Sequence, residues 1–133
     1  MEKSIEHIGI AVKNLKDAEK IFTDVLGVLP YKQESVFSEN VITSFFDCNG
    51  SKIELLAPTS NESVIAKFLE KKGEGIHHIA FKVPELSIEI ERLKGLGYHI
   101  IQEPKLGADG FTICFLHPKE TNGVLIELCQ KIA

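Results

Sequence analysis

The sequence predicts an α+β fold made of two tandem βαβββ modules. Three observations support this class: an internal repeat, short segments in which apolar and polar residues alternate, and turn residues between those segments. With 133 residues, the chain has the length of one ordinary domain. We expect a single domain over residues 1–133, with module 1 at about 4–58, a connecting helix at about 62–72 and module 2 at about 76–130. Its eight strands should form one mostly antiparallel, incompletely closed barrel with the helices outside.

The internal repeat is the most informative property of the chain. Two segments of the first half return in the second half: residues 5–12 (IEHIGIAV) as residues 76–83 (IHHIAFKV), and residues 52–56 (KIELL) as residues 125–129 (LIELC). His7 then aligns with His78, and Glu54 aligns with Glu127, at nearly the same spacing in both halves. Chance produces one such fragment more easily than both in the same order, so we interpret the chain as a duplication.

Hydrophobic periodicity predicts the elements of the first half in order. Residues 4–12 alternate as a strand, and a helix should begin after the N-cap Asn14 and end at Gly27. Its apolar stripe consists of Ala18, Ile21, Phe22 and Val25. Strands follow at 29–37, 40–48 and 51–57. The Asn49-Gly50 pair before the last of these strands predicts a type I′ turn, because that turn needs positive φ at both positions.

The second half follows the same order. The connecting helix contains Ile65, Phe68 and Leu69 and closes at Gly73. A strand at 76–83 then leads to a helix that carries Leu86, Ile90 and Leu93 and is ended by Gly95 and Gly97. Strands near 98–103, 111–117 and 123–130 complete the module.

Composition and charge exclude several classes of protein. The chain is 44% hydrophobic and 26% charged, which is typical of soluble globular domains and excludes disordered and fibrous classes. It has no apolar run near the roughly 20 residues of a membrane span and no signal-peptide pattern. A net charge of −4 disfavours nucleic acid as a partner. Three widely spaced cysteines predict no disulfide framework and favour a cytoplasmic location.

Strand alternation predicts which face carries the histidines. His7 shares a face with Gly9 and Ala11, and the residues between them are apolar. His78 shares a face with Ala80 in the same way. Since the continuous apolar face must pack on the helices, the histidine face is left to line a cavity.

The predicted hairpin at Asn49-Gly50 also fixes a strand register. Phe45 should lie opposite Glu54, and Thr43 opposite Leu56. Thr43, Phe45 and Asp47 therefore join the face that carries Glu54, with Asp47 and Lys52 at its wet rim.

Two imidazoles and two carboxylates in equivalent positions suit a divalent metal ion. The candidate ligands are His7, Glu54, His78 and Glu127. A single histidine or glutamate on a strand is more often a surface group or a satisfied polar group, but the joint recurrence favours a metal site. Other residues that could bind metal are expected to be structural or ordinary: His77 points to the helix face, His99 has no counterpart in the repeat, and Cys129 is a small buried filler.

These segments resemble the vicinal oxygen chelate superfamily, which includes glyoxalase I, the extradiol dioxygenases and the methylmalonyl-CoA epimerases. The resemblance is to the epimerases in particular and covers essentially the whole chain. It is carried by HIGIAV at 7–12, KIELLAP at 52–58, SVIAKFL at 63–69, GIHHIA at 75–80, EPKLG at 103–107, FLHPK at 115–119 and GVLIEL at 123–128.

The resemblance implies an isomerase that interconverts (2R)- and (2S)-methylmalonyl-CoA by abstracting the α-proton, through a metal-stabilised enolate. The family's metal ligands fall on His7, Glu54, His78 and Glu127, and we expect Glu127 and Glu54 to act also as the two acid/base groups. The ion would be divalent, Co²⁺ first, with Ni²⁺, Mn²⁺ or Zn²⁺ as alternatives. A homodimer acting on an acyl-CoA substrate is the family expectation.

Three further residues are candidates for substrate binding. Some relatives have a carboxylate base where this chain has Thr43, and a threonine cannot serve as that base. Thr43 nevertheless faces the predicted cavity. Lys105 and Lys119 are expected on loops near strand ends, where they would meet the phosphates of CoA.

Three other functions stay open at this point. Glyoxalase I has the same four-ligand plan. An extradiol dioxygenase uses two histidines and one glutamate on iron, so a fourth ligand at Glu54 argues against it. A metal-free binding protein of the same fold would only sequester a small molecule, and the presence of all four ligand-type residues argues against that.

Overall fold

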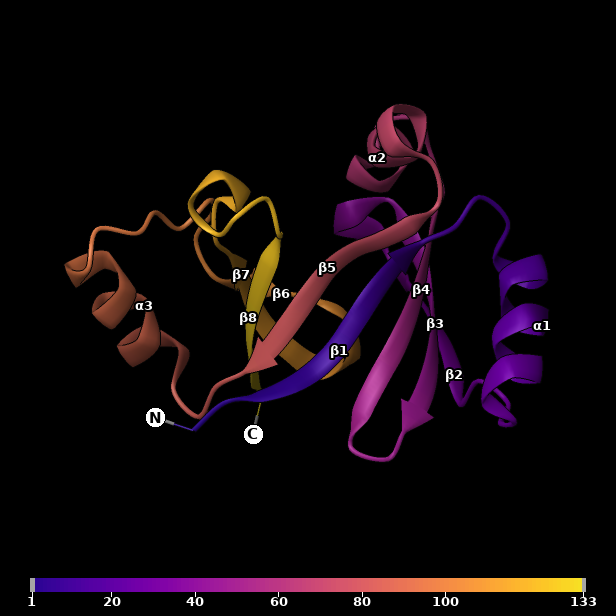
Figure 1. Ribbon diagram of the computed structural model, residues 1–133, viewed down its shortest axis with the longest axis horizontal. Coiled ribbons are helices and arrows are strands. Elements are labelled where there is room, and N and C mark those ends of the chain that lie inside the picture. The colour runs from indigo at the N-terminus through magenta and orange to yellow at the C-terminus, as the bar shows by residue number, and fades with distance from the viewer. Residues whose placement is uncertain (1, 133) are drawn as a thin grey trace. The chain divides into compact units, whose positions relative to one another are not determined.

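The structure is a computed structural model that describes residues 2–132 (Figure 1). Contacts divide the chain into two units. The N-terminal unit is His7–His77, and the C-terminal unit joins the residues up to Glu6 with those from His78 onward. None of the helices in residues 2–132 is long and apolar enough to cross a membrane.

The first module follows the predicted β-α-β-β-β order. Its elements are β1 (Ser4–Ala11), α1 (Leu15–Leu26), β2 (Lys32–Val36), the 3₁₀ helix η1 (Phe37–Glu39), β3 (Val41–Cys48) and β4 (Ser51–Pro58), followed by the connecting helix α2 (Val64–Lys72). The strands lie in the order β2-β3-β4-β1. β1 pairs with β4 in parallel, whereas β2–β3 and β3–β4 are antiparallel.

The second module repeats this plan. Its elements are β5 (Gly75–Lys82), α3 (Leu86–Gly95), β6 (Lys105–Leu106), the 3₁₀ helix η2 (Ala108–Gly110), β7 (Phe111–Phe115), the 3₁₀ helix η3 (Pro118–Glu120) and β8 (Ile126–Lys131). The strands lie in the order β5-β8-β7-β6, again with one parallel pair, β5–β8, and two antiparallel pairs. The α+β class, the duplicated topology and the mostly antiparallel pairing are therefore confirmed.

Local sequence signals place the helix ends and the hairpin as expected. The side chain of Asn14 accepts a hydrogen bond from the Asp17 N–H at 2.9 Å, and Gly27 ends α1 with φ of 72°. Asn49 and Gly50 both have positive φ, 55° and 108°, as a type I′ turn requires. The resulting β3–β4 register pairs Phe45 with Glu54, as predicted.

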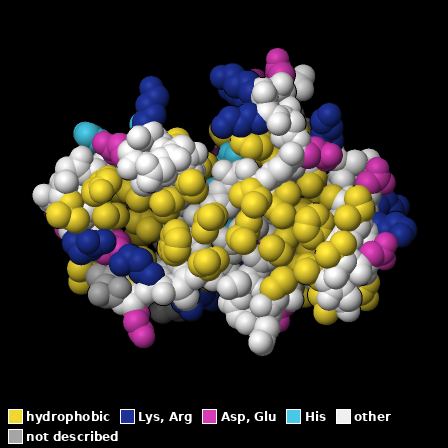
Figure 2. All heavy atoms as spheres, in the orientation of Figure 1, with side chains coloured by type: hydrophobic (Ala, Val, Ile, Leu, Met, Phe, Trp, Pro, Cys, Tyr) yellow, Lys and Arg dark blue, Asp and Glu magenta, His cyan; other side chains and the backbone are white. Residues whose placement is uncertain are grey.

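Helix α1 packs on β3 and β4 through a narrower stripe than the sequence predicts. Ala18 is buried and Phe22 packs beside it, but Ile21 and Val25 are 57% and 73% exposed. Ile21 and Val25 thus belong to the apolar stripe of the sequence but not to the buried face of α1. A pocket of about 420 Å³ lies between Ile10 of β1 and Ile21, and Figure 2 shows hydrophobic side chains on the surface over β1 and α1.

Each unit has apolar packing on both faces of its sheet. In the N-terminal unit one cluster lies under α1 and the other includes Ile65 of α2; the buried members are Val12, Ala18, Phe46, Leu55 and Ala57 in the first and Ala11, Val41, Leu56 and Ile65 in the second. In the C-terminal unit the corresponding clusters are Val83, Leu86, Ile90, Cys114 and Leu128 under α3 and Ala80, Phe111, Ile113 and Cys129 on the other face. This packing fixes the position of the strands that carry the four candidate metal ligands.

The strand predicted near 98–103 does not form. The Tyr98 N–H bonds to the Leu93 carbonyl at the end of α3, and the His99 N–H bonds to the Glu120 carboxylate, so neither group is available for a strand ladder. Only an isolated bridge between Ile100 and Leu116 remains. The sixth strand is instead Lys105–Leu106, which also corrects the prediction that Lys105 lies on a loop.

Candidate metal and proton-transfer site

The N-terminal unit brings His7 and Glu54 together on adjacent strands. The parallel register pairs Gly9 with Glu54, so His7 lies two residues earlier on the same face. Nδ1 of His7 lies 2.9 Å from Oε2 of Glu54. Both residues are buried, at 6% and 4% exposure.

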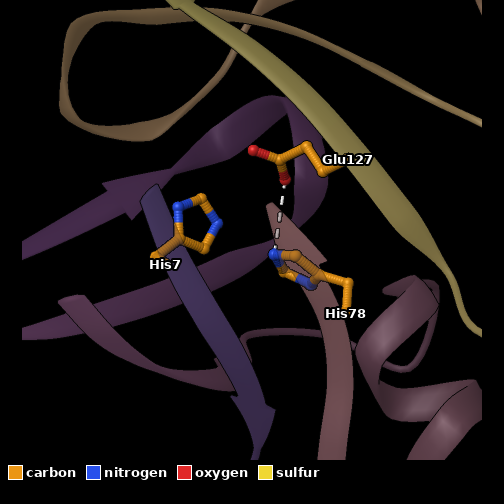
Figure 3. Close-up of side chains that lie close together, drawn as sticks. All are labelled: His7, His78 and Glu127. Carbon is orange, nitrogen blue, oxygen red and sulfur yellow. Dashed lines mark ion pairs between the residues drawn. The ribbon is translucent and has the colours of Figure 1, made fainter. Parts of the chain in front are cut away.

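The C-terminal unit builds the same pair from His78 and Glu127. Ala80 is paired with Glu127, and His78 again lies two residues earlier on the same face. Nε2 of His78 lies 3.3 Å from Oε1 of Glu127, with the imidazole directed at the carboxylate (Figure 3). Both residues are as buried as their counterparts. The internal repeat of the sequence is therefore a repeat of a buried His–Glu pair.

A phenylalanine lies opposite each glutamate on the neighbouring antiparallel strand. Phe45 is paired with Glu54, and Phe115 with Glu127. The Phe115 ring meets the His78 ring edge to face, with 5.9 Å between centroids. The Asn49-Gly50 hairpin predicts the place of Phe45, but no such signal predicts Phe115, because the corresponding Asn122-Gly123 pair lies inside a longer connection between β7 and β8 and does not form a two-residue hairpin. The duplication itself carried the missing signal, since Phe115 occupies the position that corresponds to Phe45.

A comparison with protein families agrees with this duplicated arrangement. Residues 6–115 match the family described as the Glyoxalase/Bleomycin resistance protein/Dioxygenase superfamily. The chain belongs to this superfamily. The prediction of that relationship from the sequence is confirmed.

The chain is similar over nearly its full length to other proteins. The ethylmalonyl-CoA/methylmalonyl-CoA epimerase of Cereibacter sphaeroides is 39% identical over 129 residues, which is 95% of this chain and 96% of the relative. The uncharacterized protein YqjC of Bacillus subtilis is 43% identical over 127 residues, which is 95% of this chain and 91% of the relative. A solved methylmalonyl-CoA epimerase in complex with methylmalonyl-CoA and NH₄⁺ matches with a TM-score of 0.93 and 32% identity, covering 100% of this chain and 97% of the other.

The donor atoms of each pair suit a divalent ion. Imidazole nitrogen and carboxylate oxygen are common ligands of divalent transition metals. A carboxylate buried to this extent is costly unless a cation or hydrogen-bond donors compensate its charge. Glu54 and Glu127 are both in that position, and each unit offers one imidazole and one carboxylate, donor groups that suit a divalent ion.

Thr43 lies on the same face of its sheet as Glu54, as the register predicts. It is paired with Leu56 on β4 and with Glu34 on β2. Its side chain is fully buried, and among residues 2–132 its Oγ1 is a buried polar atom with no hydrogen-bond partner. A buried hydroxyl of this kind calls for an explanation.

The two candidate lysines lie in the C-terminal unit. Lys105 is half-buried on β6, paired with Ile113 of β7. Lys119 is exposed in η3, where its backbone N–H donates to Nδ1 of His117 at 3.2 Å.

His77, His99 and Cys129, which the sequence predicts to be structural or ordinary residues, make ordinary packing and polar contacts. His77 meets the Phe68 ring of α2 edge to face at 5.0 Å, and burial, with Lys72 nearby, lowers the pKa of His77 to about 4. His99 is exposed and pairs with Glu120. Cys129 is fully buried, and its thiol donates to the Phe81 carbonyl at 3.5 Å.

Proposed function

We propose that the protein is a methylmalonyl-CoA epimerase, which interconverts (2R)- and (2S)-methylmalonyl-CoA by removing and returning the α-proton. The observation that carries this proposal is the repeated buried His–Glu pair, one in each unit. The similarity to epimerases at 32–39% identity over nearly the whole chain supports the choice of substrate.

In this proposal His7, Glu54, His78 and Glu127 together hold one divalent metal ion. Two imidazoles and two carboxylates would leave open positions on a six-coordinate ion for the substrate. Such an ion supplies Lewis-acid stabilisation of the negative charge that develops on the thioester oxygen when the α-proton leaves.

The carboxylates of Glu54 and Glu127 transfer the protons. One of the two residues, as the carboxylate, accepts the α-proton from one side of the substrate, and the other, protonated as the carboxylic acid, donates its proton from the opposite side; this inverts the centre and exchanges the protonation states of the two residues. His7 and His78 orient these carboxylates through the contacts at 2.9 and 3.3 Å. The buried surroundings of all four residues keep bulk water away from the reacting carbon.

Lys105 and Lys119 are proposed to contact the phosphates of the CoA arm. A lysine at a strand and a lysine at a 3₁₀ turn present point charges of the kind that phosphates bind. Cobalt as the native ion, a homodimer and a cytoplasmic location stay predictions of the sequence.

Proton NMR in heavy water tests the proposal. With excess Co²⁺ and methylmalonyl-CoA, we expect loss of the α-proton signal together with conversion of one epimer into the other, and neither change in chelated protein. Folded, metal-loaded protein that shows no exchange would contradict the proposal. The next substrate to try would then be the methylglyoxal–glutathione adduct, which glyoxalase I uses.

A further inference from the structure

Thr43 carries a buried hydroxyl that the fold does not use. The side chain is fully buried, and Oγ1 has no hydrogen-bond partner among the described residues. Glu34 lies opposite Thr43 on the same face, but its carboxylate lies 3.4 Å from Nζ of Lys32 and does not accept from Thr43. A valine of nearly the same shape would avoid the cost of an unpaired hydroxyl here.

The neighbouring residue Ser44 shows the opposite behaviour. Ser44 is also fully buried but points to the other face of β3, where its hydroxyl donates to Oε2 of Glu19 at 2.6 Å. That carboxylate also accepts from Nε2 of Gln33. The hydroxyl on the face that α1 covers is thus satisfied, whereas the one on the face of His7 and Glu54 is left unpaired.

The position of Thr43 relates its hydroxyl to the proposed site. Thr43 lies two residues before Phe45 on the same face of β3, and Phe45 lies opposite Glu54. His7 and Glu54 on this face are nearly as inaccessible as Thr43, so low exposure is a property of the whole row of polar groups. A ligand that reaches Glu54 therefore comes within one residue pair of the Thr43 hydroxyl.

We infer that the Thr43 hydroxyl donates a hydrogen bond to the free carboxylate of the bound acyl group. This inference rests on the proposed function and names the part of the substrate that Thr43 recognises. The hydroxyl selects thioesters of malonate type over acyl-CoA esters that lack a carboxylate, because only the former supply an anionic acceptor. Thr43 is thus a specificity residue, and the proton transfers stay with Glu54 and Glu127.

Two ligands and three variants test the inference. The dissociation constants of methylmalonyl-CoA and propionyl-CoA are measured by calorimetry on Co²⁺-supplied wild type, Thr43→Val, Thr43→Ser and Ser44→Ala. We expect Thr43→Val to reduce the preference for methylmalonyl-CoA about tenfold, the size of one hydrogen bond to a charged oxygen. Thr43→Ser retains the hydroxyl and the preference, and Ser44→Ala leaves the preference unchanged.

The melting temperature distinguishes substrate binding from a structural role. If the Thr43 hydroxyl stabilised the fold, Thr43→Val would lower Tm, whereas the inference predicts that Tm rises. Thr43→Val removes an unpaired buried hydroxyl and should raise Tm by about 3 °C, whereas Ser44→Ala should lower Tm. An unchanged preference, or a lower Tm, in Thr43→Val overturns the inference while the epimerase proposal stands. Wild-type protein that binds neither ester overturns both.

Discussion

The two buried glutamates are the residues on which the proposed chemistry depends. Glu127 lies 3.3 Å from the His78 ring and opposite the Phe115 side chain, so Glu127→Gln keeps the shape of the site and removes a basic oxygen. We expect the variant to lose at least about 100-fold in α-proton exchange, since general acid–base groups contribute about 10²–10⁴-fold. The rate of deuterium incorporation into methylmalonyl-CoA measures this.

A matched control separates chemistry from charge. Glu120→Gln removes a carboxylate that pairs with exposed His99, and it should leave exchange unchanged. Glu127→Gln protein that binds Co²⁺ and exchanges the α-proton at the wild-type rate would exclude Glu127 as an acid/base. The same comparison applies to Glu54→Gln.

At the scale of elements, α3 is tied to the N-terminal residues by one buried carboxylate. Glu89 is fully buried on α3 and lies 2.6 Å from Nζ of Lys3. It also accepts hydrogen bonds from Arg92 at 2.8 and 3.1 Å. The Arg92 hydrogen bonds, with Lys3, lower the pKa of Glu89 from 4.5 to about 2 despite its burial.

This contact predicts a dependence of stability on pH. A carboxyl with a depressed pKa in the folded state contributes its full stabilisation above pH 4.5, and the contribution disappears as pH falls toward 2. Glu89→Gln should therefore lower the free energy of unfolding by about 2 kcal/mol at pH 7, allowing for the exposure of Arg92. Urea unfolding at pH 7 and pH 3 measures the difference, which should shrink at the lower pH.

The exposed Glu91 on the same helix provides the control, because Glu91→Gln removes equal charge. It should change the unfolding free energy by less than about 0.5 kcal/mol at either pH. A difference between Glu89→Gln and wild type that stays constant with pH would show that ionisation of Glu89 does not stabilise the fold.

Short-range signals explain which elements could be predicted from the sequence. Period-two alternation places His7 and His78 on the polar faces, and the Asn49-Gly50 turn sets the β3–β4 register, because both depend on neighbours in the chain. The strand near 98–103 failed because a side chain far along the sequence, Glu120, takes the His99 N–H. The contact between Lys3 and Glu89 also joins residues that are far apart in the sequence, and hydrophobic periodicity does not predict it.

The same limit applies to the candidate site. His7, Glu54, His78 and Glu127 could be predicted because the histidine–glutamate pair occurs in both halves of the sequence. That Thr43 Oγ1 has no partner, while the adjacent Ser44 hydroxyl has one, depends on where Glu19 of α1 lies. Such a difference arises from tertiary packing, and sequence alternation gives only the faces on which the two hydroxyls lie.

At the scale of the whole molecule, duplication offers two arrangements for metal binding. Each unit holds one buried His–Glu pair, and a pair alone provides two protein ligands, fewer than stable protein sites for divalent transition metals use. If the four residues act on one ion, the chain binds one Co²⁺, and either His7→Ala or His78→Ala weakens that single site. If each pair acts alone, the chain binds two ions, and each variant loses one of them.

Calorimetric titration with Co²⁺ distinguishes these arrangements by stoichiometry. We expect one ion per wild-type chain, and a rise in Tm with Co²⁺ concentration because the ion binds the folded chain. His7→Ala and His78→Ala should each weaken Co²⁺ binding by about 10-fold or more. The double variant should lose little more affinity than either single variant, because the effects of substitutions at ligands of one ion are not additive. His99→Ala, which removes an exposed histidine of the C-terminal unit, should bind as wild type does. Two ions per chain, or losses that add in the double variant, would mean that the duplicated pairs work separately and that the proposed four-ligand site is wrong.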